Sequence, residues 1–93
     1  MTNNARNELV RRGYSYRYAG TAYLELAAQA AASSLSGPRA MMTKEVYPAI
    51  ARAANTSPAA VERAIRSVVH RYEPGLTAGD VIYDVAVGMG HAY

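Results

Sequence analysis

Apolar residues recur at three- and four-residue spacing along most of this 93-residue chain, in segments that glycine and proline separate. This period places apolar side chains on one face of a helix, whereas a strand needs strict alternation. The pattern predicts an all-α fold class: a compact bundle of about five helices that forms a single domain over residues 1–93. The expected helices cover residues 4–12, 17–34, 43–54, 58–72 and 77–89.

The starts of the third and fourth expected helices carry recognisable signals. Ser57 is a suitable N-cap, and Pro58 occupies the first helical position, where no backbone donor is missed. Thr43 is a reasonable N-cap for the third helix, but Pro48 would lie inside that helix and kink it. We therefore expect either a regular helix that starts near Tyr47 or a bent turn before it.

The third and fourth helices are joined by the three residues 55–57, a connection of the length found in helix-turn-helix motifs. Ala51 falls where the two helices cross, and Asn55 falls where the turn needs a left-handed backbone, which asparagine tolerates. These features predict a helix-turn-helix over about residues 43–72. Its shared core is expected to contain Ile50, Val61 and Ile65.

The polar face of the fourth helix indicates what the motif binds. Four residues form one stripe opposite the apolar face, and Glu62 lies beside it. Arginine reaches O6 and N7 of guanine in a major groove, and a glutamate accepts a hydrogen bond from cytosine. The alternative is a solvated face that carries a Glu62–Arg66 surface ion pair. The four stripe residues are Ala59, Arg63, Arg66 and His70.

Composition narrows the class of protein further. Ten basic and seven acidic residues give a net charge of +3, which fits an anionic partner. The absence of cysteine excludes disulfides and thiolate sites, and the scattered carboxylates with two histidines predict no enzyme, no metal site and no cofactor. The chain lacks an apolar run long enough for a membrane span and a signal-peptide pattern at its start, so we expect a cytoplasmic protein.

Arginines and tyrosines near the start of the chain leave more than one interpretation open. Tyr14, Tyr16 and Tyr18 alternate, which is compatible with a short strand, with a platform on which bases stack, or with rings packed on the core. Arg12 is expected to contact DNA phosphates without regard to sequence.

Several short motifs resemble a known family. Residues 43–44 (TK), 47–48 (YP), 50–51 (IA), 55–56 (NT) and above all 61–66 (VERAIR) look like the C-terminal DNA-binding effector domain of stage zero sporulation protein A, a response regulator of endospore formation. The resemblance covers roughly residues 5–72. It extends to the first two helices through Gly13, Gly20, Tyr23 and Leu24.

The resemblance implies sequence-specific binding to double-stranded DNA as a transcription regulator. By position, Glu62, Arg63 and Arg66 correspond to the family's base-contacting residues. Two departures concern Ala59 and Ala60, which stand where the family usually has a hydroxyl and a basic residue, and Arg17, which stands where the family often has histidine. Auxiliary or backbone contacts are expected from Arg17, Lys44, Thr56, Ser57, Ala59 and His70.

The resemblance also bears on partners and regulation. The 93 residues contain no receiver domain, so we expect no control by phosphorelay. Because the resemblance implies DNA binding, we expect the protein at the nucleoid. Residues 77–89 look like the family's final helix and predict self-association through Val81, Ile82 and Val85. A sigma factor of RNA polymerase is a weaker expectation, because the helix linked to that contact looks missing. The alternative function is a protein-interaction module that binds a regulator or a full-length family member rather than DNA.

Overall fold

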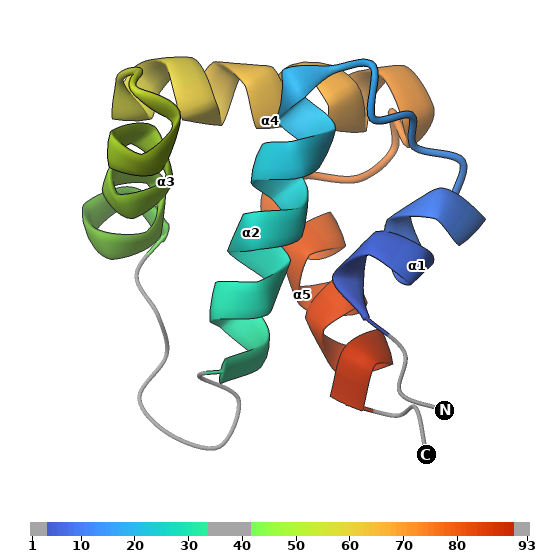
Figure 1. Ribbon diagram of the computed structural model, residues 1–93. Coiled ribbons are helices and arrows are strands. Elements are labelled where there is room, and N and C mark those ends of the chain that lie inside the picture. The colour runs from blue at the N-terminus through green and yellow to red at the C-terminus, as the bar shows by residue number, and fades with distance from the viewer. Residues whose placement is uncertain (1–3, 34–41, 91–93) are drawn as a thin grey trace.

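The computed structural model describes residues 4–33 and 42–90, and these residues form helices joined by short connections (Figure 1). The predicted all-α fold is confirmed, and no strand occurs in the described ranges. The predicted helix bounds hold to within two residues, except at the third helix and at residue 34, which lies outside the described residues. The elements are α1 (Ala5–Arg11), α2 (Ala19–Ser33), η1 (Met42–Val46, a π-helical turn), α3 (Tyr47–Ala54), α4 (Pro58–Tyr72) and α5 (Ala78–Gly90).

Helix α2 is the central element, and it packs against each of the other four α-helices. In Figure 1, α4 crosses one end of α2, while α3 lies on one side of α2 and α1 and α5 lie on the other. Gly20 makes the crossing of α2 and α4 possible, because a Cβ atom there would overlap the main-chain carbonyl group of Ala64. The small side chains of Ala27, Ala28 and Ala31 are fully buried farther along α2. Such a surface lets neighbouring helices approach closely.

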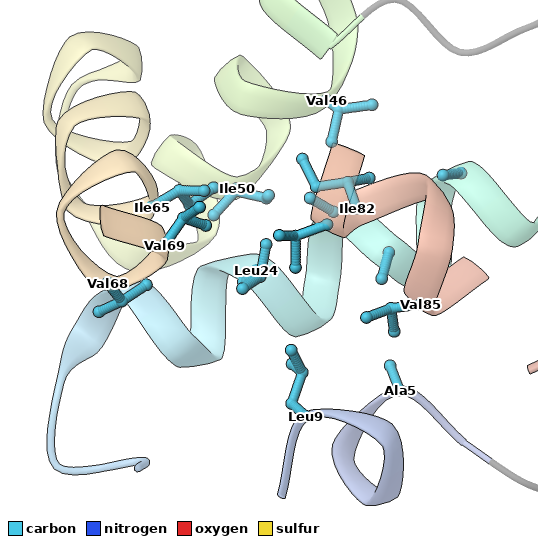
Figure 2. Packing of buried hydrophobic residues seen from close by; sticks show 14 of the residues in the cluster. Ala5, Leu9, Leu24, Val46, Ile50, Ile65, Val68, Val69, Ile82 and Val85 are labelled. Atoms are coloured by element: carbon cyan, nitrogen blue, oxygen red, sulfur yellow. The ribbon is translucent and has the colours of Figure 1, made fainter. Parts of the chain in front are cut away.

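The core is built from branched aliphatic side chains that converge on α2 from every other helix (Figure 2). Leu9 of α1, Leu24 of α2, Ile65 of α4 and Ile82 of α5 are among the largest fully buried side chains. Full burial of one such side chain stabilises a fold by about 1.5–3 kcal/mol. The core therefore depends on contacts between segments that lie far apart in the sequence.

Helix α5 belongs to this core, which corrects the expected role of three of its residues. Val81, Ile82 and Val85 are each fully buried within the single chain. Side chains that are already covered by α2 and its neighbours offer no apolar surface to a second copy. The prediction of self-association through these three residues is therefore wrong, because the monomer buries them in its own core.

The third helix begins differently from its expected N-cap. The regular helix starts at Tyr47 with Pro48 in its first turn, which confirms the first of the two alternatives that the sequence left open. Its N-cap position is Val46, which makes no side-chain capping bond, so Thr43 does not cap this helix. The π-helical turn η1 directly precedes α3, so the chain is already helical before Pro48. Within the described residues no helix has the length and apolar character that crossing a membrane requires.

Candidate nucleic-acid interface

The turn between α3 and α4 has the tight geometry that its sequence predicts. Asn55 adopts a left-handed backbone conformation, with φ 57° and ψ 49°. The backbone N–H of Thr56 donates to the carbonyl of Ala51 at 2.9 Å, which satisfies an acceptor at the end of α3. Ala51 itself is buried where the two helices meet, and Figure 1 shows α3 and α4 at a steep angle to each other. This arrangement fits the expected helix-turn-helix.

The start of α4 is fixed by its cap. The Ser57 backbone is extended, and its hydroxyl oxygen accepts a hydrogen bond from the N–H of Ala60 at 3.1 Å. Pro58 takes the first position of the helix, as predicted. Because the cap and the left-handed turn lie next to each other, the direction in which α4 leaves α3 is tightly defined.

Helix α4 separates its apolar and basic side chains onto different faces. Val61, Ile65, Val68 and Val69 are buried against the rest of the bundle. The predicted stripe lies on the opposite side, where the structure leaves four side chains exposed to solvent. A helix that is held by one face and carries basic groups on the other can insert the basic face into a groove. The exposed stripe residues are Ala59, Arg63, Arg66 and His70.

The three predicted base-contacting residues differ in their surroundings. Arg66 forms an ion pair with Glu62, one turn earlier on α4. Arg63 forms no ion pair with any carboxylate of the residues that the structure describes. The pair lies close to Tyr47 of α3, where burial raises the pKa of the phenol and the Glu62 charge adds to that effect. The Arg63 guanidinium can therefore bind an external hydrogen-bond acceptor directly, whereas Arg66 must first break its ion pair with Glu62.

The expected auxiliary residues are accessible but are spread over three segments. Thr56 and Ser57 are exposed at the turn before α4. Lys44 is exposed on η1, and Arg17 is exposed just before α2. Arg17 and Arg71 of α4 both lie near the Tyr18 ring, and Thr43 of η1 lines a pocket together with Arg66 of α4.

The structure assigns Arg12 a structural role instead of the expected phosphate contact. Its guanidinium donates to both carboxylate oxygens of Glu73, at 2.9 and 3.0 Å, and lies 3.7 Å from Asp84. The Tyr14 hydroxyl donates to the same Glu73 carboxylate at 3.0 Å. The hydrogen bond from Arg12 holds the pKa of Glu73 below its ordinary value, and the same bond raises the pKa of Arg12. This cluster ties the end of α1 to the residues that follow α4.

The alternating tyrosines form no strand and pack against protein groups. The Tyr14 ring is buried and lies 5.0 Å, centroid to centroid, from the ring of Tyr72. The Tyr16 hydroxyl donates to Glu25 of α2. Burial is the largest cause that raises the pKa of both phenols, and the bonds to Glu73 and Glu25 add to it. The Tyr14 ring is therefore not free to stack on bases, and the guanidinium carbon of Arg6 already lies 4.5 Å from the centre of the Tyr16 ring.

Sequence reasoning missed one basic group at the C-terminal end of α4. The guanidinium carbon of Arg71 lies 4.8 Å from the centre of the Tyr18 ring, and that of Arg17 lies 5.7 Å from the same centre. More than fifty residues separate Tyr18 from Arg71, and no local pattern links them. The only signal in the sequence was the position of Arg71 in the last turn of α4.

The distribution of charge distinguishes α4 from α5. Helix α4 carries Arg63, Arg66 and Arg71 against a single acidic residue. Helix α5 carries Asp80 and Asp84 and no basic residue. The described residues contain no group of three or more His, Asp or Glu side chains that could hold a metal ion. Helix α4 is therefore basic, whereas α5 is acidic.

Comparison with known protein families matches residues 6–77 to the family described as Sporulation initiation factor Spo0A C terminal. Searches of curated proteins and of solved structures found no match. The matched stretch includes most of α1 and all of α2, α3 and α4, and α5 follows it. The family is one of DNA-binding effector domains. Because the match covers most of the sequence, the chain belongs to the Spo0A C-terminal effector-domain family.

Proposed function

We propose that this domain binds double-stranded DNA in a sequence-specific manner as a transcription regulator, with α4 in the major groove. The observation that carries the proposal is the exposed basic stripe of α4. It lies opposite a fully buried face on a helix whose direction is set by the Asn55 turn and the Ser57 cap. An α-helix fits the width of the major groove, and a rigidly held helix can keep one register on the bases.

The stripe residues divide the recognition between them. Arg63, which has no competing carboxylate among the described residues, donates to O6 and N7 of a guanine. Arg66 exchanges its ion pair with Glu62 for a second guanine, and Glu62 then accepts from the amino group of a cytosine. The exchange costs little, because an exposed ion pair contributes only about 0.2–1 kcal/mol.

Contacts to the sugar–phosphate backbone position the helix without reading sequence. Lys44 and Arg17 provide charge on the two sides of α4, and Thr56 and Ser57 provide hydrogen-bonding groups at its start. Ala59 is small enough to let the first turn of α4 approach the base edges. His70 provides the remaining auxiliary contact, a hydrogen bond from its imidazole to a DNA phosphate.

The test is a selection of binding sites from a random duplex library, followed by affinity measurements on the enriched and on a scrambled duplex. Arg63→Ala should weaken binding to the enriched duplex by about 1–3 kcal/mol and leave the scrambled duplex nearly unchanged. Arg11→Ala is the matched control, because it removes the same charge from α1, where Arg11 pairs with Glu8. Equal losses on both duplexes for Arg63→Ala would refute base reading by α4.

A groove between α2 and α3 supports the second candidate, a protein-interaction module. Leu26 is 42% exposed and lines this groove together with the apolar side chains Ala30, Ala49 and Ala53. The expected occupant is a regulator or a full-length family member. Binding through this groove should vary little with salt and should be lost in Leu26→Glu, whereas a DNA complex weakens steeply as salt rises. Calorimetry with a full-length family regulator at low and high salt separates the two candidates.

Two of the expected partners are not part of this proposal. Self-association through Val81, Ile82 and Val85 requires side chains that the core already buries. Contact with a sigma factor rests on the resemblance alone, and the described surface adds no support for it.

A further inference from the structure

Tyr18, just before α2, lies beside two arginines from distant parts of the chain. The guanidinium carbon of Arg71 is 4.8 Å from the ring centre, and that of Arg17 is 5.7 Å away. Tyr72 packs edge-on against the Tyr18 ring, with a centroid distance of 6.3 Å, and also contacts the buried Tyr14. The Tyr18 ring thus packs against the core through Tyr72 and lies within cation–π distance of both guanidinium groups.

These two arginines differ in their partners from three other arginines of the domain. Arg11, Arg12 and Arg66 each form an ion pair with a carboxylate. Arg17 and Arg71 form none with the carboxylates of the described residues. Two like charges near one ring repel each other, and a bound anion relieves that repulsion. The pair is therefore prepared for an anionic ligand that comes from outside the chain.

The position of Arg71 on α4 indicates which anion this is. Arg71 follows Arg63 by eight residues, and at about 100° per residue it lies about 80° around the helix axis from Arg63. It therefore lies at the edge of the exposed stripe, on the side where Gly20 brings the start of α2 against Ala64. When the stripe faces the base edges, the sides of the helix face the two sugar–phosphate walls of the groove.

We propose that Arg17, Tyr18 and Arg71 form a phosphate clamp that grips the DNA backbone on the α2 side of α4. The proposal rests on the proposed function and adds residues to the same surface. The two guanidinium groups donate hydrogen bonds to one phosphate group or to two adjacent ones, and Tyr18 keeps them in place. Arginine suits this role because its planar group can donate two parallel bonds to phosphate oxygens while it stacks on a ring.

The test measures the salt dependence of DNA affinity for Arg71→Ala on the selected duplex and on the scrambled duplex. A lost phosphate contact should weaken both duplexes alike and reduce the slope of log affinity against log salt by about one. When salt rises from about 50 to about 200 mM, both proteins lose affinity. The fold loss of the variant should be about 3.5 times smaller than that of the wild type. An unchanged slope with unchanged affinities would overturn the clamp.

Tyr18 variants test whether the ring positions the arginines. Tyr18→Leu should weaken both duplexes, and it should add little to Arg71→Ala in the double variant, because the two side chains act together. Tyr18→Phe keeps the ring and should restore wild-type affinity. Thermal unfolding of each variant verifies that the fold is kept. Fully additive losses for Tyr18→Leu and Arg71→Ala would show that the ring does not position Arg71.

Two reference variants separate the failure of the clamp from the failure of the proposed function. Arg11→Ala removes one charge from α1, where Arg11 pairs with Glu8 and not with a residue of α4. It should leave the slope unchanged. Suppose that Arg63→Ala weakens binding to the selected duplex only, while Arg71→Ala has the same affinities and salt slope as Arg11→Ala. The clamp is then wrong, and the proposal that α4 reads bases stands. If none of these variants alters binding to any duplex, both proposals fail.

Discussion

At Gly20, a missing side chain decides how closely α2 approaches α4. A Cβ atom at this position would overlap the Ala64 carbonyl and lie 3.0 Å from a methyl carbon of Val68. The neighbouring backbone cannot yield without moving α4 as a whole. The position of α4 on the bundle therefore depends on one glycine.

We predict that Gly20→Ala lowers the free energy of unfolding by about 1–3 kcal/mol, because the extra methyl group forces the two helices apart. Gly79→Ala is the control. Gly79 is also helical, but a Cβ atom there would meet only the Thr77 hydroxyl at 3.8 Å. This change should stabilise the domain by about 0.5–1 kcal/mol, the ordinary preference of a helix for alanine. Urea denaturation followed by circular dichroism measures both, and similar values for the two variants would contradict the close crossing.

The Glu73 cluster makes stability depend on pH. The hydrogen bond from Arg12 holds the Glu73 pKa below its ordinary value of 4.5, and the Tyr14 bond lowers it further. A carboxyl whose pKa is lower in the folded state contributes stability above its unfolded pKa, and that contribution is lost as the pH falls through the folded pKa.

We predict that Glu73→Gln is less stable than the wild type by about 1.5–3 kcal/mol near pH 7, because charged hydrogen bonds are lost. The difference should shrink as the pH falls below about 4, where the wild-type carboxyl also becomes neutral. Denaturation curves at a series of pH values measure this. A difference between the two proteins that stays constant down to about pH 2 would show that Glu73 acts through packing rather than charge.

At the scale of elements, the connection from α3 to α4 combines a left-handed residue with a helix cap. Asn55 has a positive φ of 57°, and it is the only non-glycine residue in the described ranges with that property. A left-handed conformation costs an ordinary residue about 1–2 kcal/mol, and asparagine is among the residues that adopt it most readily. The turn thereby fixes α4 relative to α3 with only three residues.

We predict that Asn55→Val destabilises the domain by about 1–2 kcal/mol and weakens DNA binding, since a β-branched side chain is strained at this φ. Asn55→Gly should stay within a few tenths of a kcal/mol of the wild type, because glycine adopts the conformation freely. Thermal denaturation and binding to the selected duplex are the measurements. If valine is tolerated as well as glycine, the left-handed turn does not determine the direction of α4.

At the scale of the whole molecule, α5 completes the core that also holds α4. Ile82 is fully buried, and the face of α5 that carries it packs chiefly on α2. Asp84 of the same helix lies near Arg12, so α5 also extends the Glu73 cluster. The helix that the sequence had indicated as a contact between copies is a structural part of each copy.

We predict that Ile82→Ala lowers the free energy of unfolding by about 2–5 kcal/mol, the cost of a cavity in a packed core. Sedimentation equilibrium over a range of protein concentrations should give the same association state for the variant and the wild type. Leu76→Ala is the control, because Leu76 is exposed and should contribute little. A variant that keeps its stability but changes its association state would show that Ile82 serves an interface.

The sequence by itself determined the helices and the connection between α3 and α4. The period of apolar residues, the Ser57–Pro58 start and the asparagine turn act within a few residues of each other, so they are readable without the fold. Only the tertiary structure decided which charged and apolar groups remain available for binding. It paired Arg12 with Glu73, enclosed Val81, Ile82 and Val85, and brought Arg71 to Tyr18. Each of these outcomes depends on packing between segments distant in sequence, and no local pattern encodes such contacts.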